Sequence, residues 1–225
     1  MDASQRFTAD GFAIVPEVID NLLCAEISDR IAAMNLAGAG CRRLLGHPWC
    51  VAVAARLRTN PAIRDLLPKR AVAVQCTLFS KTSERNWLVP PHQDLSIPVS
   101  QRVDGSECTG WSEKDGDLFV QPPIKVLENL VAIRVHLDPC PVENGALRVT
   151  PGSHREGRLD RPSIRRLIAR QGEEIVPVPR AGALVMRPLL LHSSSKSALG
   201  SPRRVLHFLF GPHALPARLQ WKTAV

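Results

Sequence analysis

The chain has 225 residues, 44% of them apolar, and its 29 basic and 21 acidic side chains give a formal net charge of +8. This length allows one domain with a substantial core, or at most two domains. No apolar run approaches the ~18 residues of a membrane-spanning helix, which excludes an integral membrane protein.

The first residues and the cysteines indicate the compartment. The opening MDASQRFTADGF has neither the basic region nor the apolar region of a signal peptide, so secretion is not expected. The six cysteines are scattered, with no CxxC pair, and are expected to be reduced thiols. The sequence therefore predicts a cytoplasmic protein.

The positive charge raises the question of a nucleic-acid partner. The arginines are spread along the chain, and their densest group, in RPSIRRLIAR, is typical of a solvated helix face. The chain has no tyrosine and few other aromatic residues that could stack on bases. A nucleic-acid partner is therefore not favoured over a small molecule, and the sequence does not fix the oligomeric state.

The first 70 residues are expected to be mainly helical. Residues 16–35 carry apolar side chains at an approximate i, i+4 spacing, which is typical of an amphipathic helix. Two shorter helices are predicted over residues 47–58 and 60–68, the second with Asn60 as its cap and Pro61 in its first position.

The following residues have the pattern of short strands bounded by turn-forming clusters. The β-rich segments are residues 71–81, 88–99, 130–138, 145–150, 173–179, 183–189 and 203–210. With a segment around His192 they make roughly eight strands. Short connections favour an antiparallel double-sheet barrel or jelly roll over residues 71–215. We expect one mainly β domain, residues 1–225, with the N-terminal helices packed on the outside of the barrel.

Residues 101–128 form a long polar insertion between two of these segments. A loop of this length inside a compact domain is usually functional or disordered. We expect it to lie over the mouth of the barrel and to influence substrate specificity.

The stretch PPHQDLSIP places His92 and Asp94 two positions apart, on one face of a predicted strand. His192 follows a later strand and supplies a distant third ligand. Two histidines and one carboxylate form a facial triad that leaves coordination positions open, which suits Fe(II). The pair alone is weak support, because such pairs also form surface salt bridges.

Arg203 begins the strand RRVLHFLF, eleven residues after His192. A guanidinium binds a remote carboxylate through a bidentate, permanently charged fork. Arg203 and Arg204 point to opposite faces of the strand, so only one can face the barrel interior. Arg204 is expected to be a surface charge.

Several motifs in register resemble the phytanoyl-CoA dioxygenase family of Fe(II)- and 2-oxoglutarate-dependent oxygenases. They are FTADGFAIVPEVID near the start, His92-Gln93-Asp94, ENGALR, PGSH, His192 and Arg203. The resemblance implies a double-stranded β-helix, a jelly roll or cupin-like barrel. It implies that His92, Asp94 and His192 bind iron and that O2 is a cosubstrate. It also implies that Arg203 and Ser194 bind the remote carboxylate of 2-oxoglutarate, with Gln93 beside this cosubstrate.

Arg134 departs from the family, many of whose members have a tryptophan at this place. If its strand lines the site, Arg134 points at the cosubstrate or at an anionic group of the substrate. A buried arginine needs such a partner, because an unpaired buried charge is costly. The alternative is a partner among the protein's own acids.

Other motif residues have plainer interpretations. Asn144-Gly145 predicts a tight hairpin turn with a positive φ at the glycine, and PGSH predicts a structured turn in which His154 is a turn or rim residue. His136 and His207 lie either near the pocket or in the core with hydrogen-bond partners. Three side chains, with ordinary packing as the alternative, are expected to shape the substrate entrance: Lys81, Trp87 and Trp111.

The expected function is hydroxylation of a small molecule, with release of succinate and CO2. The carboxylate of Asp94 leaves no ligand place for a halide and so favours hydroxylation over halogenation, while desaturation and ring formation stay open. Arg134 and the net charge favour an acidic substrate. The alternatives are a noncatalytic barrel that binds a metal or ligand and, on charge alone, a nucleic-acid demethylase.

Overall fold

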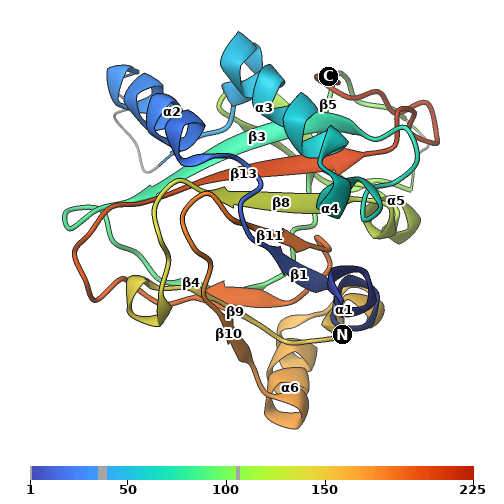
Figure 1. The fold of residues 1–225 in the computed structure, drawn as a ribbon. Helices are drawn as coiled ribbons and strands as arrows, with labels where there is room; N and C mark the ends of the chain where they lie inside the picture. The colour runs from blue at the N-terminus through green and yellow to red at the C-terminus, as the bar shows by residue number, and fades with distance from the viewer. Residues whose placement is uncertain (1, 35–39, 105–106) are drawn as a thin grey trace.

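A computed structural model describes residues 2–34, 40–104 and 107–225 (Figure 1). The α-helices are α1 (Ala3–Asp10), α2 (Asn21–Ala33), α3 (Pro48–Thr59), α4 (Pro61–Arg64), α5 (Ile124–Glu128) and α6 (Arg161–Gln171). The 3-10 helices are η1 (Leu44–Gly46), η2 (Val142–Asn144) and η3 (Ser153–Arg155). The strands are β1 (Phe12–Val15), β2 (Gly40–Cys41), β3 (Val72–Lys81), β4 (Val89–His92), β5 (Ile97–Val99), β6 (Thr109–Lys114), β7 (Asp117–Gln121), β8 (Val131–His136), β9 (Leu147–Val149), β10 (Glu174–Val176), β11 (Ala183–Met186), β12 (His192–Ser194) and β13 (Arg203–Gly211).

The described strands form three antiparallel sheets. The six-stranded sheet has the order β1-β11-β8-β13-β3-β2, the four-stranded sheet β10-β9-β12-β4 and the three-stranded sheet β5-β7-β6. Figure 1 shows β4, β9 and β10 below the large sheet. Antiparallel pairing is confirmed, but the prediction of a mainly β closed barrel needs correction. The fold is mixed α/β, and among the described strands none of the small sheet pairs with an edge strand of the large one.

Helices α2, α3 and α4 cover the outer face of the large sheet (Figure 1). The residues packed between helices and sheet include Ile27, Ile31, Val53, Leu57, Leu78, Leu206 and Phe208. On β13, side chains alternate between the two faces of the sheet. Leu206 and Phe208 therefore join this core, while Arg203 and His207 point to the opposite side.

The three predicted helices are present, but α2 begins at Asn21 rather than at residue 16, and α4 ends at Arg64 rather than at residue 68. The side chain of Asn60 accepts a hydrogen bond from the Ala62 amide at 2.9 Å, and Pro61 is the first residue of α4. Helix α1 and strand β1 were not predicted. A capping box between Asp2 and Gln5 starts α1, and β1 is held by antiparallel pairing with β11.

The segment 101–128 is not the loop that the sequence predicted. Its described part, which leaves out residues 105–106, contains the hairpin β6–β7 and helix α5, and β7 also pairs with β5. Asp115 and Gly116 both have positive φ, as a two-residue hairpin turn requires. Ion pairs of Asp115 with Arg42 (2.7 Å) and of Asp117 with Arg43 (3.0 Å) join the hairpin to the chain after β2.

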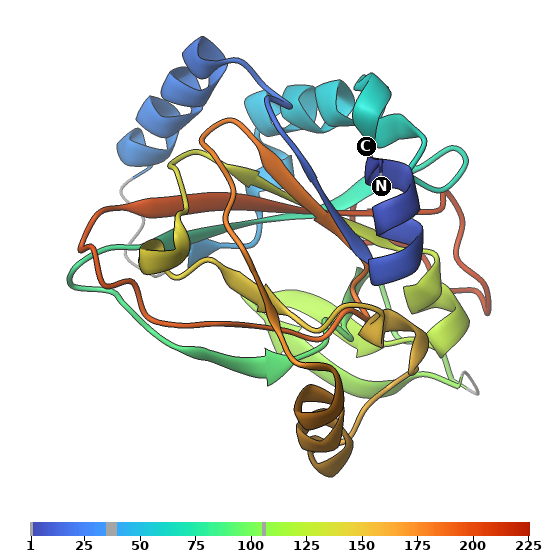
Figure 2. The same cartoon turned by 60° about the horizontal axis from the view of Figure 1, so that its bottom comes forward.

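The arginine-rich helix α6 projects away from the sheets (Figures 1 and 2). All four of its arginines are exposed, which confirms the predicted solvated face. All six cysteines lie in the described part of the chain and are free thiols. Among the described helices, none has the length and apolar character needed to cross a membrane.

Candidate active site

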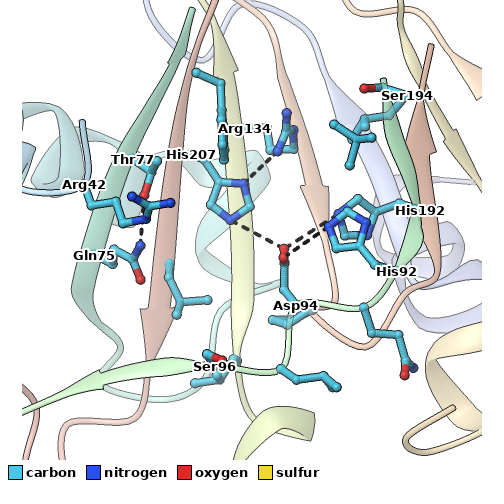
Figure 3. Close-up of a pocket in the computed structure, with 18 of the residues that line it drawn as sticks. Arg42, Gln75, Thr77, His92, Asp94, Ser96, Arg134, His192, Ser194 and His207 are labelled. Carbon is cyan, nitrogen blue, oxygen red and sulfur yellow. Dashed lines mark hydrogen bonds and ion pairs between the residues drawn. The ribbon is translucent and has the colours of Figure 1, made fainter. Parts of the chain in front are cut away.

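A cavity of about 410 Å³ lies between the large and the small sheet. Its walls come from β3, β8 and β13 on one side, from β4 and β12 on the other, and from the β6–β7 hairpin. Figure 3 shows 18 of the residues that line it. The predicted residues His92, Gln93, Asp94, Arg134, His192, Ser194 and Arg203 all line this cavity.

His92, Asp94 and His192 form a group that can hold a metal ion. His92 ends β4, Asp94 follows two residues later, and His192 begins β12 directly opposite His92 in the antiparallel register. Asp94 Oδ1 lies 3.7 Å from His92 Nε2, and Asp94 Oδ2 lies 3.8 Å from His192 Nε2. The three ligand atoms are all within 4.8 Å of one another.

Both imidazoles are fixed in the tautomer that leaves Nε2 free to bind a metal. His92 Nδ1 lies 2.9 Å from the Pro90 carbonyl oxygen, and His192 Nδ1 lies 2.9 Å from that of Leu190. A carbonyl oxygen only accepts, so each Nδ1 carries the proton and donates it. Each Nε2 therefore directs a lone pair toward Asp94, the arrangement usual for metal-binding histidines.

Backbone contacts hold the chain on both sides of these ligands. The Asp94 amide donates to the Pro188 carbonyl at 2.9 Å. The Leu191 amide, one residue before His192, donates to Ser153 Oγ at 2.8 Å. Ser153 belongs to the PGSH motif, which forms the predicted structured turn as η3. This turn therefore positions a ligand strand, a role that the sequence did not reveal.

The protonation states favour metal binding. Burial raises the pKa of Asp94, but the surrounding imidazoles and Arg134 outweigh it and hold the pKa below its usual value. Burial lowers the pKa of His192 to about 4, although Asp94 opposes this effect. At neutral pH the site thus offers a carboxylate and a neutral imidazole as metal ligands.

Arg134 and His207 lie beside the triad. Arg134 Nη1 is 2.9 Å from His207 Nδ1, and His207 Nε2 is 3.9 Å from Asp94 Oδ2 (Figure 3). Arg134 is 7% exposed, and no acid among the described residues forms an ion pair with it. Burial, then Arg203, lowers its pKa to about 10. His207 therefore lies at the pocket. The acid whose charge acts on Arg134 is Asp94, which raises the pKa of Arg134 without forming an ion pair with it.

A second cationic group lies near Ser194, where Arg203 lines the cavity and Lys81 contacts Ser194 without lining the cavity itself. Arg203 is 4% exposed and Lys81, opposite it in the β3–β13 register, is 1% exposed. Arg203 Nη1 donates to the Gly145 carbonyl, and Lys81 Nζ donates to the Ser195 carbonyl at 2.9 Å and Ser194 Oγ at 3.4 Å. Neither cation has a carboxylate partner within the described part of the chain. Two buried cations without an acid favour an anionic ligand.

Arg204 points away from this group. Its guanidinium and Asp138 form a bidentate ion pair at 2.8 and 2.7 Å. Lys81, by contrast, was expected at the substrate entrance and is buried beside Arg203 instead. The sequence alone does not show that Lys81 lies opposite Arg203, because this depends on how β3 pairs with β13. Trp87 lines the cavity, whereas Trp111 packs against the core next to the three-stranded sheet.

The amide of Gln93 is bound to backbone rather than free. Its Nε2 donates to the carbonyls of Gly157 and Leu189, each at 2.8 Å, and its Oε1 accepts from the Leu159 amide at 2.9 Å. Gln93 lies between two candidate metal ligands in the sequence, and these hydrogen bonds tie it to two other segments of the chain. A contact with the cosubstrate stays a prediction.

His136 and His154 lie outside the cavity. His136 is a core residue, and neither of its ring nitrogens has a hydrogen-bond partner among the described residues. His154 belongs to η3, and its ring packs against Gly11. Gly145 has the predicted positive φ of 68°, but the ENG turn is not a hairpin, because β8 and β9 belong to different sheets.

The family model described as phytanoyl-CoA dioxygenase (PhyH) matches residues 7–205, which include His92, Asp94, His192 and Arg203. The chain belongs to this family. The resemblance seen in the sequence is therefore confirmed. Among curated protein sequences, none matches this phytanoyl-CoA dioxygenase family member significantly.

Several solved structures share the fold. SnoN, an alpha ketoglutarate dependent epimerase from nogalamycin biosynthesis, is 19% identical, with a TM-score of 0.63 over 93% of this chain and 81% of that chain. HygX from Streptomyces hygroscopicus, with nickel and 2-oxoglutarate bound, is 17% identical, with a TM-score of 0.63 over 97% and 93%. SnoK, a carbocyclase from nogalamycin biosynthesis, is 15% identical, with a TM-score of 0.61 over 93% and 83%. At such identities the likeness establishes the fold alone.

Proposed function

We propose that this protein is an Fe(II)- and 2-oxoglutarate-dependent dioxygenase that hydroxylates a small molecule. The observation that carries the proposal is the His92, Asp94 and His192 group, in which both imidazoles direct Nε2 toward one carboxylate. The large and small sheets correspond in this proposal to the two walls of a double-stranded β-helix.

The donor set fits Fe(II), because two imidazoles and one carboxylate on one side leave other coordination positions open. His92, Asp94 and His192 would hold the metal. The cationic end of the cavity fits a dicarboxylate, since buried Arg203 and Lys81 have no acid partner among the described residues. Arg203 Nε likewise has no hydrogen-bond partner there. Arg203 and Ser194 would bind the remote carboxylate of 2-oxoglutarate, assisted by Lys81.

Arg134 would contact the cosubstrate between the metal and Ser194. Its Nε has no hydrogen-bond partner among the described residues, and Figure 3 places it between His207 and Ser194. Gln93 lines the cavity and would lie beside the cosubstrate. Its amide, which is bound to backbone groups, would hold the segment between His92 and Asp94 in place.

Iron and 2-oxoglutarate would supply the activation of dioxygen, with release of succinate and CO2. The protein's part is to position the substrate and exclude water. Neighbours with this fold are an epimerase and a carbocyclase, so the fold does not select the reaction. Asp94 would keep a carboxylate on the metal, which favours hydroxylation over halogenation and leaves desaturation and ring formation as alternatives. A small-molecule substrate is supported by the structure of HygX with nickel, 2-oxoglutarate and hygromycin B bound.

The test begins with anaerobic addition of Fe(II) and 2-oxoglutarate, which should produce a weak visible charge-transfer band. In air, and in the presence of a metabolite library that contains a substrate, the wild type should release succinate. Asp94→Ala and His192→Ala should lose both signals, while His213→Ala, at an exposed histidine, should keep them. Full succinate release by both triad variants would refute the metal site.

The same assay separates the alternatives. A noncatalytic binding barrel would show the band but no succinate. Once a substrate is found, mass spectrometry under labelled dioxygen distinguishes the reactions. Hydroxylation adds one labelled oxygen atom, whereas desaturation, ring formation or epimerisation adds none.

A further inference from the structure

We propose that the substrate carries an anionic group, a carboxylate or a phosphate, which binds between Arg42 and Lys114. This inference rests on the proposed function and names the substrate class for the same cavity. The two cations belong to a polar wall made of Arg42, Gln75, Thr77, Lys114 and Gln121, all of which line the cavity. Figure 3 shows Arg42, Gln75 and Thr77 on the side away from His92 and His192.

The charge of the cavity is strongly positive. Among the described residues, its lining contains four cationic side chains, Arg42, Lys114, Arg134 and Arg203, and a single acidic one, Asp94. In the proposed function Asp94 binds the iron. One carboxylate of 2-oxoglutarate also binds the iron, the remote carboxylate binds Arg203, and Arg134 contacts the cosubstrate between them. Arg42 and Lys114 then have no role in the cosubstrate site. A cavity lined by one sign of charge concentrates ligands of the opposite sign.

Lys114 is the unpaired cation of this wall. No carboxylate within the described residues forms an ion pair with it, whereas its neighbours in the hairpin turn, Asp115 and Asp117, are both paired. Its Nζ instead lies 4.9 Å from the ring centroid of Phe119, which also lines the cavity. An aromatic face holds an ammonium in place without neutralising it. The positive charge of Lys114 is thus available to a ligand.

Arg42 is paired, but only weakly. It donates from Nη1 alone to Asp115 at 2.7 Å, and the two side chains are 42% and 49% exposed. Exposed pairs of this kind contribute little to stability. A guanidinium has five N–H donors, so a substrate anion can bind Arg42 beside or in place of Asp115.

Gln75 and Thr77 add hydrogen-bonding groups on the adjacent strand β3. Residues 41 and 43 pair with β3 at Leu78 and Cys76, which places Arg42 next to Thr77. Gln75 Nε2 donates to Thr77 Oγ1 at 2.8 Å, so the Thr77 hydroxyl hydrogen is directed to another acceptor. The wall therefore presents donors to the anion and leaves the metal side of the cavity to the C–H bond that is oxidised.

The test uses the enzyme loaded with Fe(II) and 2-oxoglutarate under anaerobic conditions. The probes are carboxylic acids and phosphate monoesters, each paired with its methyl ester or its dephosphorylated form. Binding is followed by the change in the visible band and by the thermal midpoint, and turnover by succinate release in air. We expect anions to bind and to be oxidised, and their neutral counterparts to fail.

Variants assign the binding to the two cations. Lys114→Gln and Arg42→Gln should each weaken anion binding at least about tenfold, the effect of losing a charge-assisted hydrogen bond, without changing the KM for 2-oxoglutarate. Lys125→Gln, an exposed lysine in the same segment, is the matched control and should change neither. Asp115→Asn removes the same ion pair as Arg42→Gln but keeps the guanidinium. It should leave anion binding unchanged or stronger, whereas a purely structural role of the ion pair predicts weaker binding.

Three results would overturn the inference. The first is that the neutral counterparts bind as well as the anions. The second is that no anion binds although the visible band forms. The third is that Lys114→Gln and Arg42→Gln both bind anions as the wild type does. Failure of the band itself would instead refute the proposed function, because it reports Fe(II) and 2-oxoglutarate alone.

Discussion

Arg134 determines the tautomer of His207. A guanidinium only donates hydrogen bonds, so the 2.9 Å contact between Arg134 Nη1 and His207 Nδ1 makes that nitrogen an acceptor. The ring proton of neutral His207 is then on Nε2, which faces Asp94 Oδ2 at 3.9 Å. Asp94 therefore lies among three imidazoles, two that present lone pairs and one that presents an N–H. This arrangement allows one carboxylate oxygen to bind metal while the other faces a donor.

Replacing His207 by Leu should weaken Fe(II) binding. Groups that hydrogen-bond or orient a metal ligand typically contribute about 10- to 100-fold to metal affinity. The measurement is an anaerobic Fe(II) titration at saturating 2-oxoglutarate, followed by the visible band. His207→Gln, which retains an N–H donor, should recover part of the affinity, and His213→Leu should match the wild type. Unchanged affinity in His207→Leu would show that His207 has no part in positioning Asp94.

Arg203 and Arg204 offer a matched pair on opposite faces of β13. Arg203→Ala should raise the KM for 2-oxoglutarate about tenfold to hundredfold, because a hydrogen-bonded charge is lost from the anion site. Arg204→Ala removes the ion pair with Asp138 and should lower the free energy of unfolding by about 1 kcal/mol, with an unchanged KM. Steady-state kinetics and urea unfolding measure both. An increase in KM confined to Arg204→Ala would reverse the assignment.

Lys81 should make 2-oxoglutarate binding depend on pH. Burial, then the charge of Arg203, lowers the pKa of Lys81 to about 8, while the Cys140 thiol group acts in the opposite direction. The ammonium is charged below this pKa and neutral above it, so the KM for 2-oxoglutarate should rise as the pH increases from 7 to 9. Lys81→Met should show a higher KM at pH 7 and a flatter profile. A profile with the same slope in both proteins would exclude Lys81 as the cause.

The sequence was sufficient to predict features that depend only on neighbouring residues, such as the faces of a strand and the caps of helices. Alternation along a strand separated Arg203 from Arg204 on β13. His92 and Asp94 do come together, but not as residues of one strand, because β4 ends at His92. Helix caps such as Asn60 also depend on neighbouring residues only. Each of these predictions needs no knowledge of how the strands pair.

Features that depend on register between distant strands could not be predicted. Lys81 lies beside Arg203 because β3 pairs with β13 in one particular register, and Arg42 meets the hairpin only because residues 109–121 fold into two strands. The polar composition of that segment indicated a loop, since exposed strands carry few apolar residues. The separation into three sheets likewise depends on where each short strand ends.

His136 should reduce stability in acid. Burial, then Arg134 and Arg203, lowers its pKa well below 6.5, so below that pH the unfolded chain binds a proton that the folded chain does not. The free energy of unfolding should therefore fall as the pH decreases from 6.5, by up to about 1.4 kcal/mol per pH unit for this group. His136→Leu should be at least as stable at pH 7 and less sensitive to acid, as urea unfolding between pH 7 and 5 would show. An unaltered acid sensitivity would mean that other groups account for it.

Gly145 couples the ENG turn to Arg203. Its φ of 68° is unfavourable for other residues, and a Cβ atom there would lie 2.7 Å from the Ser195 carbonyl oxygen and 3.3 Å from Arg203 Nη1. Gly145→Ala should thus strain the backbone and also displace the guanidinium that would bind 2-oxoglutarate. The expected result is a lower thermal midpoint together with a KM for 2-oxoglutarate raised about tenfold.

Gly200→Ala separates these two effects. Gly200 has a similar φ of 65°, but a Cβ atom there meets no atom within 4 Å. The backbone strain should therefore lower the thermal midpoint of both variants, while only Gly145→Ala should raise the KM. If both substitutions raised the KM equally, the effect would come from general destabilisation. If neither did, the position of Arg203 would not depend on the turn, and its contact with the Gly145 carbonyl would be incidental to cosubstrate binding.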